Sequence, residues 1–120
     1  MGATGAIQYL TKPHQYAQVY ARGSAHYSDL VVLRATPSGL PFTRCGFSVG
    51  KKVGKAVVRN KVKRRLREIA RLTPIKSGWD IVLIARPGAA AASYADLDRA
   101  TADLLGRARL LDGQGSPGTP

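Results

Sequence analysis

Acidic residues, cysteine and long apolar runs are all scarce in this sequence, and each shortage excludes some classes of protein. Only 7 of the 120 residues are Asp or Glu, against 19 Lys and Arg, so the formal net charge is +12. Such a charge opposes a compact state unless an anionic partner neutralises it, which predicts a polyanionic partner. No segment approaches the roughly 18 apolar residues of a membrane helix, and residues 1–7 lack the pattern of a secretory signal. We therefore expect a cytoplasmic protein with no membrane partner.

The few residues that could perform chemistry are not arranged as in a catalytic site. The seven acids lack the spacing of a two-metal nuclease, and no Ser, His or Cys triad is recognisable. His14 and His26 are predicted at the surface. Cys45 lies among apolar residues, which favours a buried thiol over a reactive one, and a single cysteine cannot form an internal disulfide. The sequence thus predicts no catalytic residue and no cofactor bound by the chain, and it assigns no metal ligand.

The first half of the chain predicts one helix followed by strands. Residues 11–22 carry apolar and aromatic side chains at helical spacing, with Pro13 near the first turn and Gly23 at the end. Two paired strands and a third, half-buried strand follow from β-branched composition and from apolar–polar alternation. These strands are expected at residues 24–27, 30–36 and 44–49.

The second half predicts a helix, a strand and a final helix. From about Ala56, apolar residues recur on one helical stripe, formed by Val58, Val62, Leu66, Ile69 and Leu72. Residues 81–85 are an unbroken apolar run, typical of a strand that is covered on both faces. Ser93 is a candidate N-cap for a last helix that reaches about residue 111.

This order of elements predicts an α/β two-layer sandwich with a central four-stranded sheet. The chain is long enough for one domain with a modest core. We expect that domain at residues 8–111, with a flexible terminus at residues 1–7 and a disordered tail at residues 112–120.

Most of the positive charge lies in one segment. Residues 51–71 contain ten Lys or Arg and one acid, Glu68, which amounts to +9 of the total +12. At 100° per residue, the apolar stripe of this helix spans about 120°, and the cations occupy the opposite side. Arg65 is the exception, because it projects toward the apolar arc. Without acids one turn away the cations repel one another, so this face favours a partner with rows of phosphates over solvent alone.

Three other interpretations fit parts of this pattern. A ribosomal or other structural RNA-binding protein would share the size, the charge and the lack of catalytic residues. A DNA-binding helix would also be basic, but the apolar stripe attaches this helix to a core, and no dimerisation heptad is present. A stand-alone nuclease would need the acid cluster that the sequence lacks.

The segment FSVGKKVGKAVVRNKVKRRLRE, residues 47–68, resembles the signature of the bacterial ribonuclease P protein family. The basic RNR helix of that family is represented here by Arg59, Asn60 and Lys61. Lysine at the third position keeps the charge but lacks the planar guanidinium that binds phosphate with two hydrogen bonds. The aromatic first helix and the strand near residues 78–86 also resemble the family, so the resemblance covers about residues 8–111.

The resemblance implies a fold in which the basic helix joins two parallel strands by a left-handed crossover, an exception to the usual right-handed rule. It also implies a protein that binds the catalytic RNA and precursor tRNA, and not DNA. The RNA subunit would hold the Mg²⁺ ions and cut the 5′ leader. The residues expected to contact the catalytic RNA are Lys51, Lys52, Lys55, Arg59, Asn60, Lys61, Lys63, Arg64 and Arg67.

The resemblance implies a second surface as well, a cleft between the first helix and the sheet that takes the single-stranded leader. The residues expected to line it are Tyr16, Tyr20 and Phe47. Tyr16 and Tyr20 lie four residues apart and therefore share one helical face. From the residues alone, core packing of this pair is the better explanation, whereas the resemblance favours leader binding.

Overall fold

Helices and strands alternate along residues 7–113, the part of the chain that the computed structural model describes. The predicted order of helix, strands, helix, strand and helix is confirmed, with one additional strand at the start. The elements are β1 (Gln8–Tyr9), α1 (Pro13–Arg22), β2 (Ser24–Tyr27), β3 (Val31–Pro37), β4 (Arg44–Ser48), η1 (Lys51–Val53), α2 (Ala56–Leu72), β5 (Trp79–Ala85), η2 (Pro87–Ala90) and α3 (Tyr94–Arg107).

The five strands form one sheet in the order β1-β4-β5-β3-β2. β4 and β5 are parallel neighbours joined by α2, and β1 is parallel to β4, while β3 pairs antiparallel with β5 and β2. The expectation of four strands is therefore wrong by one, because β1 has only two residues, too few to show alternation, and its partner is distant in sequence. The left-handed sense of the β4-α2-β5 crossover stays a prediction.

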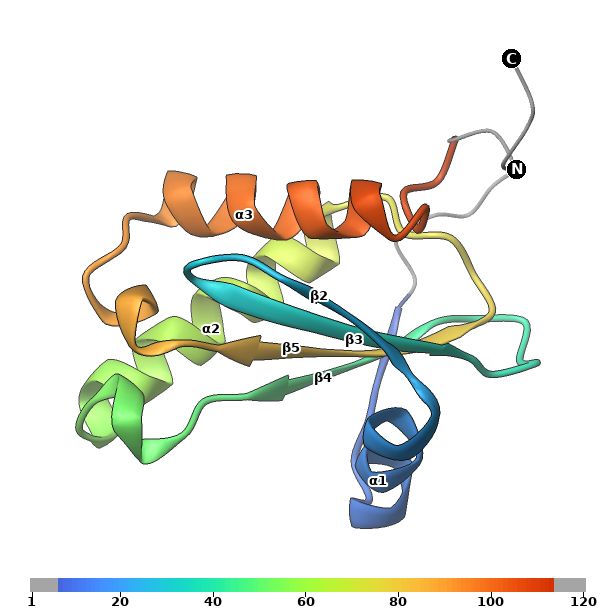
Figure 1. Ribbon diagram of the computed structural model, residues 1–120, viewed down its shortest axis with the longest axis horizontal. Coiled ribbons are helices and arrows are strands. Elements are labelled where there is room, and N and C mark those ends of the chain that lie inside the picture. Colours follow the sequence, from blue (N-terminus) through green and yellow to red (C-terminus); the bar gives the residue numbers. More distant parts are fainter. Residues whose placement is uncertain (1–6, 114–120) are drawn as a thin grey trace.

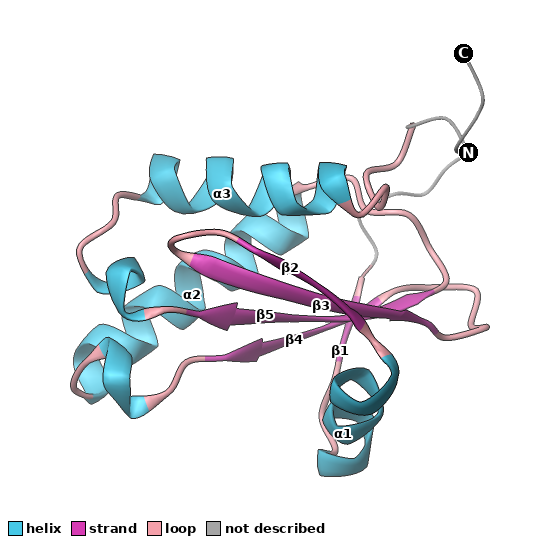
Figure 2. Ribbon diagram, in the orientation of Figure 1, coloured by secondary structure: helices cyan, strands magenta, loops and turns pink. Residues whose placement is uncertain are grey.

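The helices cover the two faces of the sheet unequally. Figure 1 shows α2 and α3 together on one face and α1 alone on the other, where it covers only part of the sheet. Figure 2 shows β1 joined to α1 by a short loop. The larger core cluster lies between the sheet and the α2–α3 layer, and a smaller one beneath α1 comprises Leu10, Val19 and Val82. The α/β class is confirmed, and α1 adds a partial layer on the second face.

Short sequence signals determine where the helices begin. Pro13 occupies the first turn of α1, where a missing N–H is tolerated, and the side chain of Gln15 accepts the N–H of Lys12 at 3.0 Å. Ser93 caps α3 as predicted, since its Oγ accepts the N–H of Asp96 at 3.0 Å. These caps satisfy backbone donors that have no partner inside the helix.

The predicted termini lie almost entirely outside the described residues. At the N-terminal end, Ile7 packs against the larger core cluster. At the C-terminal end, the N–H of Asp112 donates to the carbonyl of Pro74 at 2.7 Å. The described chain is therefore attached to the domain at both of its ends.

A buried ion pair joins the two parallel central strands. Arg44 donates two hydrogen bonds to Asp80, from Nε at 2.8 Å and from Nη2 at 2.6 Å, and the two residues are register partners in β4 and β5. Asp80 is buried, whereas the Arg44 side chain is 21% exposed. The hydrogen bonds to Asp80 raise the pKa of Arg44. The strands are thus held by side chains as well as by the backbone ladder.

We predict that Asp80→Ala lowers the free energy of unfolding by about 3 kcal/mol, because it leaves Arg44 without its partner. Asp103→Ala is the matched control, since it removes an exposed i,i+4 pair with Arg107 and should change stability by less than about 1 kcal/mol. Urea unfolding followed by circular dichroism measures both. Equal effects of the two substitutions would contradict a structural role for the buried pair.

We also predict that Cys45 is inert in the folded protein. The thiol is fully buried, as expected from the sequence, and burial raises its pKa from 9.0 to about 12, with a smaller contribution from Asp80. Because the thiolate is the reactive form, the rate of reaction with an aromatic disulfide reagent should stay very low from pH 7 to pH 9. The same reagent should react rapidly once the chain is unfolded in guanidinium. Fast reaction of the native protein at pH 8 would show that this position opens.

Candidate nucleic-acid interface

α2 carries the predicted cationic surface, and its opposite side attaches it to the core. Val62, Leu66, Ile69 and Ala70 are buried against the sheet and α3. Because they form one stripe, most charged side chains of α2 point away from the core. The exposed polar residues of this segment are Lys51, Lys52, Lys55, Asn60, Lys61, Lys63, Arg64, Arg67 and Arg71, and Arg59 is half-buried. We call this set the α2 cationic face.

The apolar stripe is shorter than predicted. Leu72 is 60% exposed, because it is the last residue of α2 and lies beyond the side chains that cover the preceding turn. Val58, near the other end, is half-buried and packs at the margin of the larger core cluster. Ala70, which was not assigned to the stripe, is fully buried. The middle of α2 is thus the part of the helix that is most deeply buried in the core.

Three arginines of this segment already bond within the protein. Arg59 Nε donates to the carbonyl of Gly54 at 3.1 Å, and Arg65 Nη1 donates to the carbonyl of Ala92 at 3.1 Å. The position of Arg65 agrees with its predicted projection toward the apolar arc. Arg71 forms two hydrogen bonds with Glu68, which raise the pKa of the arginine.

The other cations of α2 remain available. Within residues 7–113, Lys61, Lys63 and Arg64 are exposed and form no ion pair with a carboxylate. They are therefore the strongest candidates for phosphate contacts.

An aromatic pair borders the α2 cationic face. The ring centroids of Tyr9 and Phe47 lie 6.0 Å apart, and the guanidinium carbon of Arg67 lies 5.7 Å from the first ring and 6.0 Å from the second. Register explains the pair, because Tyr9 is aligned with Cys45, two residues before Phe47 on the same side of β4. Each cation–π contact of this kind contributes about 0.5–1 kcal/mol at an exposed site.

Phe47 does not lie with Tyr16 and Tyr20, so the expectation that it lines a cleft beneath the first helix is wrong. Its neighbour Gly46 faces α1 so closely that a Cβ there would lie 2.6 Å from Cε1 of Tyr16. Consecutive residues of a strand point to opposite faces, so the ring of Phe47 turns toward α2. It belongs to the larger core cluster.

The two tyrosines of α1 lie in different environments. Tyr16 is half-buried, packs on the smaller core cluster and donates weakly to the carbonyl of Leu10 at 3.5 Å. Tyr20 is 39% exposed. Arg34 of β3 donates to the carbonyl of Tyr20 at 2.9 Å and holds its guanidinium 5.7 Å from that ring. We call Tyr20 and Arg34, with the sheet surface that α1 leaves uncovered, the α1-side surface.

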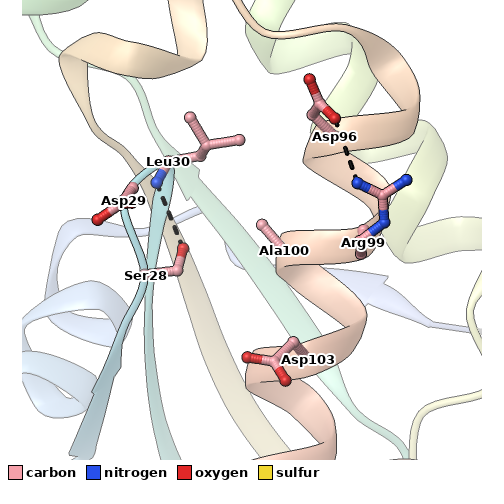
Figure 3. A pocket seen from close by; sticks show the side chains of 7 residues that line it. All are labelled: Ser28, Asp29, Leu30, Asp96, Arg99, Ala100 and Asp103. Atoms are coloured by element: carbon pink, nitrogen blue, oxygen red, sulfur yellow. Dashed lines mark hydrogen bonds and ion pairs between the residues drawn. The ribbon is translucent and has the colours of Figure 1, made fainter.

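A pocket of about 330 Å³ lies elsewhere, between the β2–β3 turn and α3 (Figure 3). Asp29, Asp96 and Asp103 line it together with a single cation, Arg99, whose guanidinium is paired with Asp96 at 3.3 Å. Three carboxylates against one arginine make this pocket unfavourable for phosphate.

Within residues 7–113, none of the helices has the length and the apolar composition of a membrane span.

Comparison with known proteins decides between the interpretations that the sequence left open. The sequence model of the family described as Ribonuclease P matches residues 6–109. This chain belongs to the ribonuclease P protein family. It is 48% identical over 102 residues to the ribonuclease P protein component of Dehalococcoides mccartyi strain CBDB1, covering 85% of each chain. It is 37% identical to that of Alkaliphilus oremlandii, covering 89% of this chain and 96% of the other.

Solved structures of ribonuclease P proteins share the fold. The protein from Staphylococcus aureus superposes with a TM-score of 0.78 at 26% identity, covering 87% of this chain and 97% of the other. The protein from Thermotoga maritima superposes with a TM-score of 0.76 at 28% identity, covering 83% and 96%. The sequence resemblance to this family is therefore confirmed.

Two residues of these surfaces were not predicted from sequence. Arg34 had a detectable signal, because it is the only charged residue in the apolar strand segment LVVLRAT. Tyr9 had none, since the strand that places it is too short to show a pattern.

We predict that Lys63 and Arg64 contact phosphates when the chain binds RNA. Replacing both with Gln should weaken binding to ribonuclease P RNA and reduce the slope of log affinity against log salt by about one per lost phosphate contact. The matched control replaces Arg99 and Arg109 with Gln, which removes the same charge from outside the α2 cationic face. Filter binding between 50 and 400 mM salt measures the slopes, and equal slopes for the two double variants would contradict the assignment.

Proposed function

We propose that this chain is the protein subunit of a bacterial-type ribonuclease P, which binds the catalytic RNA and the 5′ leader of precursor tRNA and promotes removal of the leader. Family membership supports the assembly, and the α2 cationic face is the observation that carries the RNA-binding role. The catalytic RNA would occupy this face through Lys51, Lys52, Lys55, Arg59, Asn60, Lys61, Lys63, Arg64 and Arg67.

The geometry of α2 suits a folded RNA. A helix whose apolar stripe is buried keeps its cations at fixed spacing, so little ordering is needed when phosphates bind. Both kinds of cation are present, and arginine can bind phosphate with two hydrogen bonds or stack on a base, whereas lysine acts as a point charge. Arg64 and Lys63 supply one of each at adjacent positions.

The α1-side surface suits a single strand. Tyr20 exposes an aromatic ring on which a leader base could stack, a contact worth about 1–3 kcal/mol that tolerates any sequence. Arg34 is half-buried and places its guanidinium 5.7 Å from the ring centroid, so its positive charge would attract the phosphates of such a strand. This combination fits a protein that must accept many different leaders.

In this proposal the RNA subunit holds the catalytic Mg²⁺ ions, and the protein supplies binding surface alone. Within residues 7–113, no three His, Cys, Asp or Glu side chains gather where they could hold a metal ion. Asp80, the buried acid, is engaged by Arg44. The protein would therefore act by neutralising phosphate and by positioning the leader.

Reconstitution tests the proposal directly. The chain should restore cleavage of precursor tRNA by a bacterial ribonuclease P RNA at a low magnesium concentration at which the RNA alone is nearly inactive. The chain alone should not cleave at any magnesium concentration. A ribosomal protein of similar charge is the control and should give no stimulation. Failure of the chain to exceed that control would contradict the proposal.

We predict that substitutions of the two tyrosines of α1 have different effects, one on binding and the other on stability. Tyr20→Ala should weaken holoenzyme binding to precursor tRNA about tenfold and leave mature tRNA binding nearly unchanged, because mature tRNA has no leader. Tyr16→Ala should instead lower the free energy of unfolding by about 2 kcal/mol, because that ring packs on Gly46. Binding titrations and urea unfolding measure the two effects. A stable Tyr20→Ala variant that discriminates precursor from mature tRNA as well as the wild type does would exclude leader stacking.

A further inference from the structure

Tyr9 is an exposed aromatic residue for which core packing gives no reason. It lies on the two-residue edge strand β1, which within residues 7–113 pairs only with β4. The side chain is 39% exposed, whereas the neighbouring ring of Phe47 is buried. Phe47 therefore belongs to the core, and Tyr9 rests against it with much of its ring in water.

The surroundings of Tyr9 are cationic. Arg67 of α2 holds its guanidinium over the rings of Tyr9 and Phe47, at 5.7 and 6.0 Å. Arg67 is exposed, and it forms no ion pair with a carboxylate of the described chain. Arg71 follows one turn later on the same side of α2, but its charge is paired with Glu68, so Arg67 supplies the free positive charge beside the ring. A partly open ring beside an unneutralised guanidinium is the combination that binds a nucleotide, since the base can stack and the phosphate can pair.

We propose that Tyr9 and Arg67 form a binding site for one unpaired nucleotide of the catalytic RNA. The base stacks on the exposed part of the Tyr9 ring, Arg67 binds the adjacent phosphate, and Phe47 supports the ring from the core side. The nucleotide is unpaired, because a base within a helix is already stacked on its neighbours and its face is not accessible. The inference rests on the proposed function and adds a base contact to a surface otherwise composed of phosphate contacts.

Position within the fold assigns this site to the catalytic RNA and not to the leader. Tyr9 and Phe47 lie on the side of the sheet that α2 covers, and Arg67 is itself part of the α2 cationic face. Tyr16 and Tyr20 belong to α1, on the opposite face of the sheet (Figure 1). An RNA bound along α2 would reach Tyr9 without leaving that face.

The test compares two exposed tyrosines on opposite edges of the sheet. Tyr9→Leu keeps apolar contact with Phe47 but removes the aromatic face, and Tyr27→Leu is the matched control on β2, where the side chain is 58% exposed. Each full-length variant is titrated with ribonuclease P RNA in the absence of tRNA. Tyr9→Leu should weaken binding about tenfold with an unchanged salt slope, because a neutral ring releases no counterions. Tyr27→Leu should bind as the wild type does, and Tyr9→Trp should retain affinity.

Several results would overturn the inference. Full affinity of Tyr9→Leu for ribonuclease P RNA would exclude a stacked base. A loss seen only when precursor tRNA is added to the holoenzyme would assign Tyr9 to the leader. An equal loss in Tyr9→Trp would show that Tyr9 is needed for its fit to the protein and not for stacking. Failure of the proposed function is distinguishable, because the wild-type chain would then neither bind this RNA nor stimulate cleavage.

Discussion

The burial of one apolar stripe of α2 is the interaction on which the rest of the structure depends. Segment 51–71 carries a net charge of +9, and its cations repel one another in the absence of a partner. Val62, Leu66 and Ile69 offset that repulsion, because each is buried between the sheet and α3. The packing also turns the charges outward as one surface. The same contacts that stabilise the fold therefore create the α2 cationic face, which is the proposed phosphate-binding surface.

Consecutive side chains of β4 point to opposite faces of the sheet, which keeps the α1-side surface and the α2 cationic face apart. Gly46 faces α1 and leaves room for the ring of Tyr16, whereas Phe47 faces α2 and supports Tyr9 beneath Arg67. One strand thus contributes to both sides of the sheet within two residues. In the account proposed here, this places the catalytic RNA and the leader on opposite faces, so that one small domain can contact both without their competing.

The features that could be predicted from the sequence were those with a periodic pattern that extends over many residues. The seventeen residues of α2 contain several turns of apolar periodicity, and its charge excess is visible without any fold. Features fixed by single long-range contacts could not be predicted: β1 exists only through its pairing with β4, and Tyr9 meets Arg67 only after the sheet and α2 have packed. Phe47 was assigned to the wrong face because family resemblance identified the residue without its orientation. Leu72 fits the periodicity, but the core does not extend to the last turn.

Crosslinking from two single positions tests most directly whether the two faces bind different RNAs. The only native cysteine is fully buried, so a photoreactive group can be attached at an introduced thiol, Lys63→Cys on α2 or Ala17→Cys on α1. Both positions are exposed, and residue 17 lies one turn before Tyr20. In a holoenzyme assembled with precursor tRNA, position 63 should crosslink to the catalytic RNA and position 17 to the 5′ leader. Crosslinks from both positions to the same RNA segment would contradict the separation of the two surfaces.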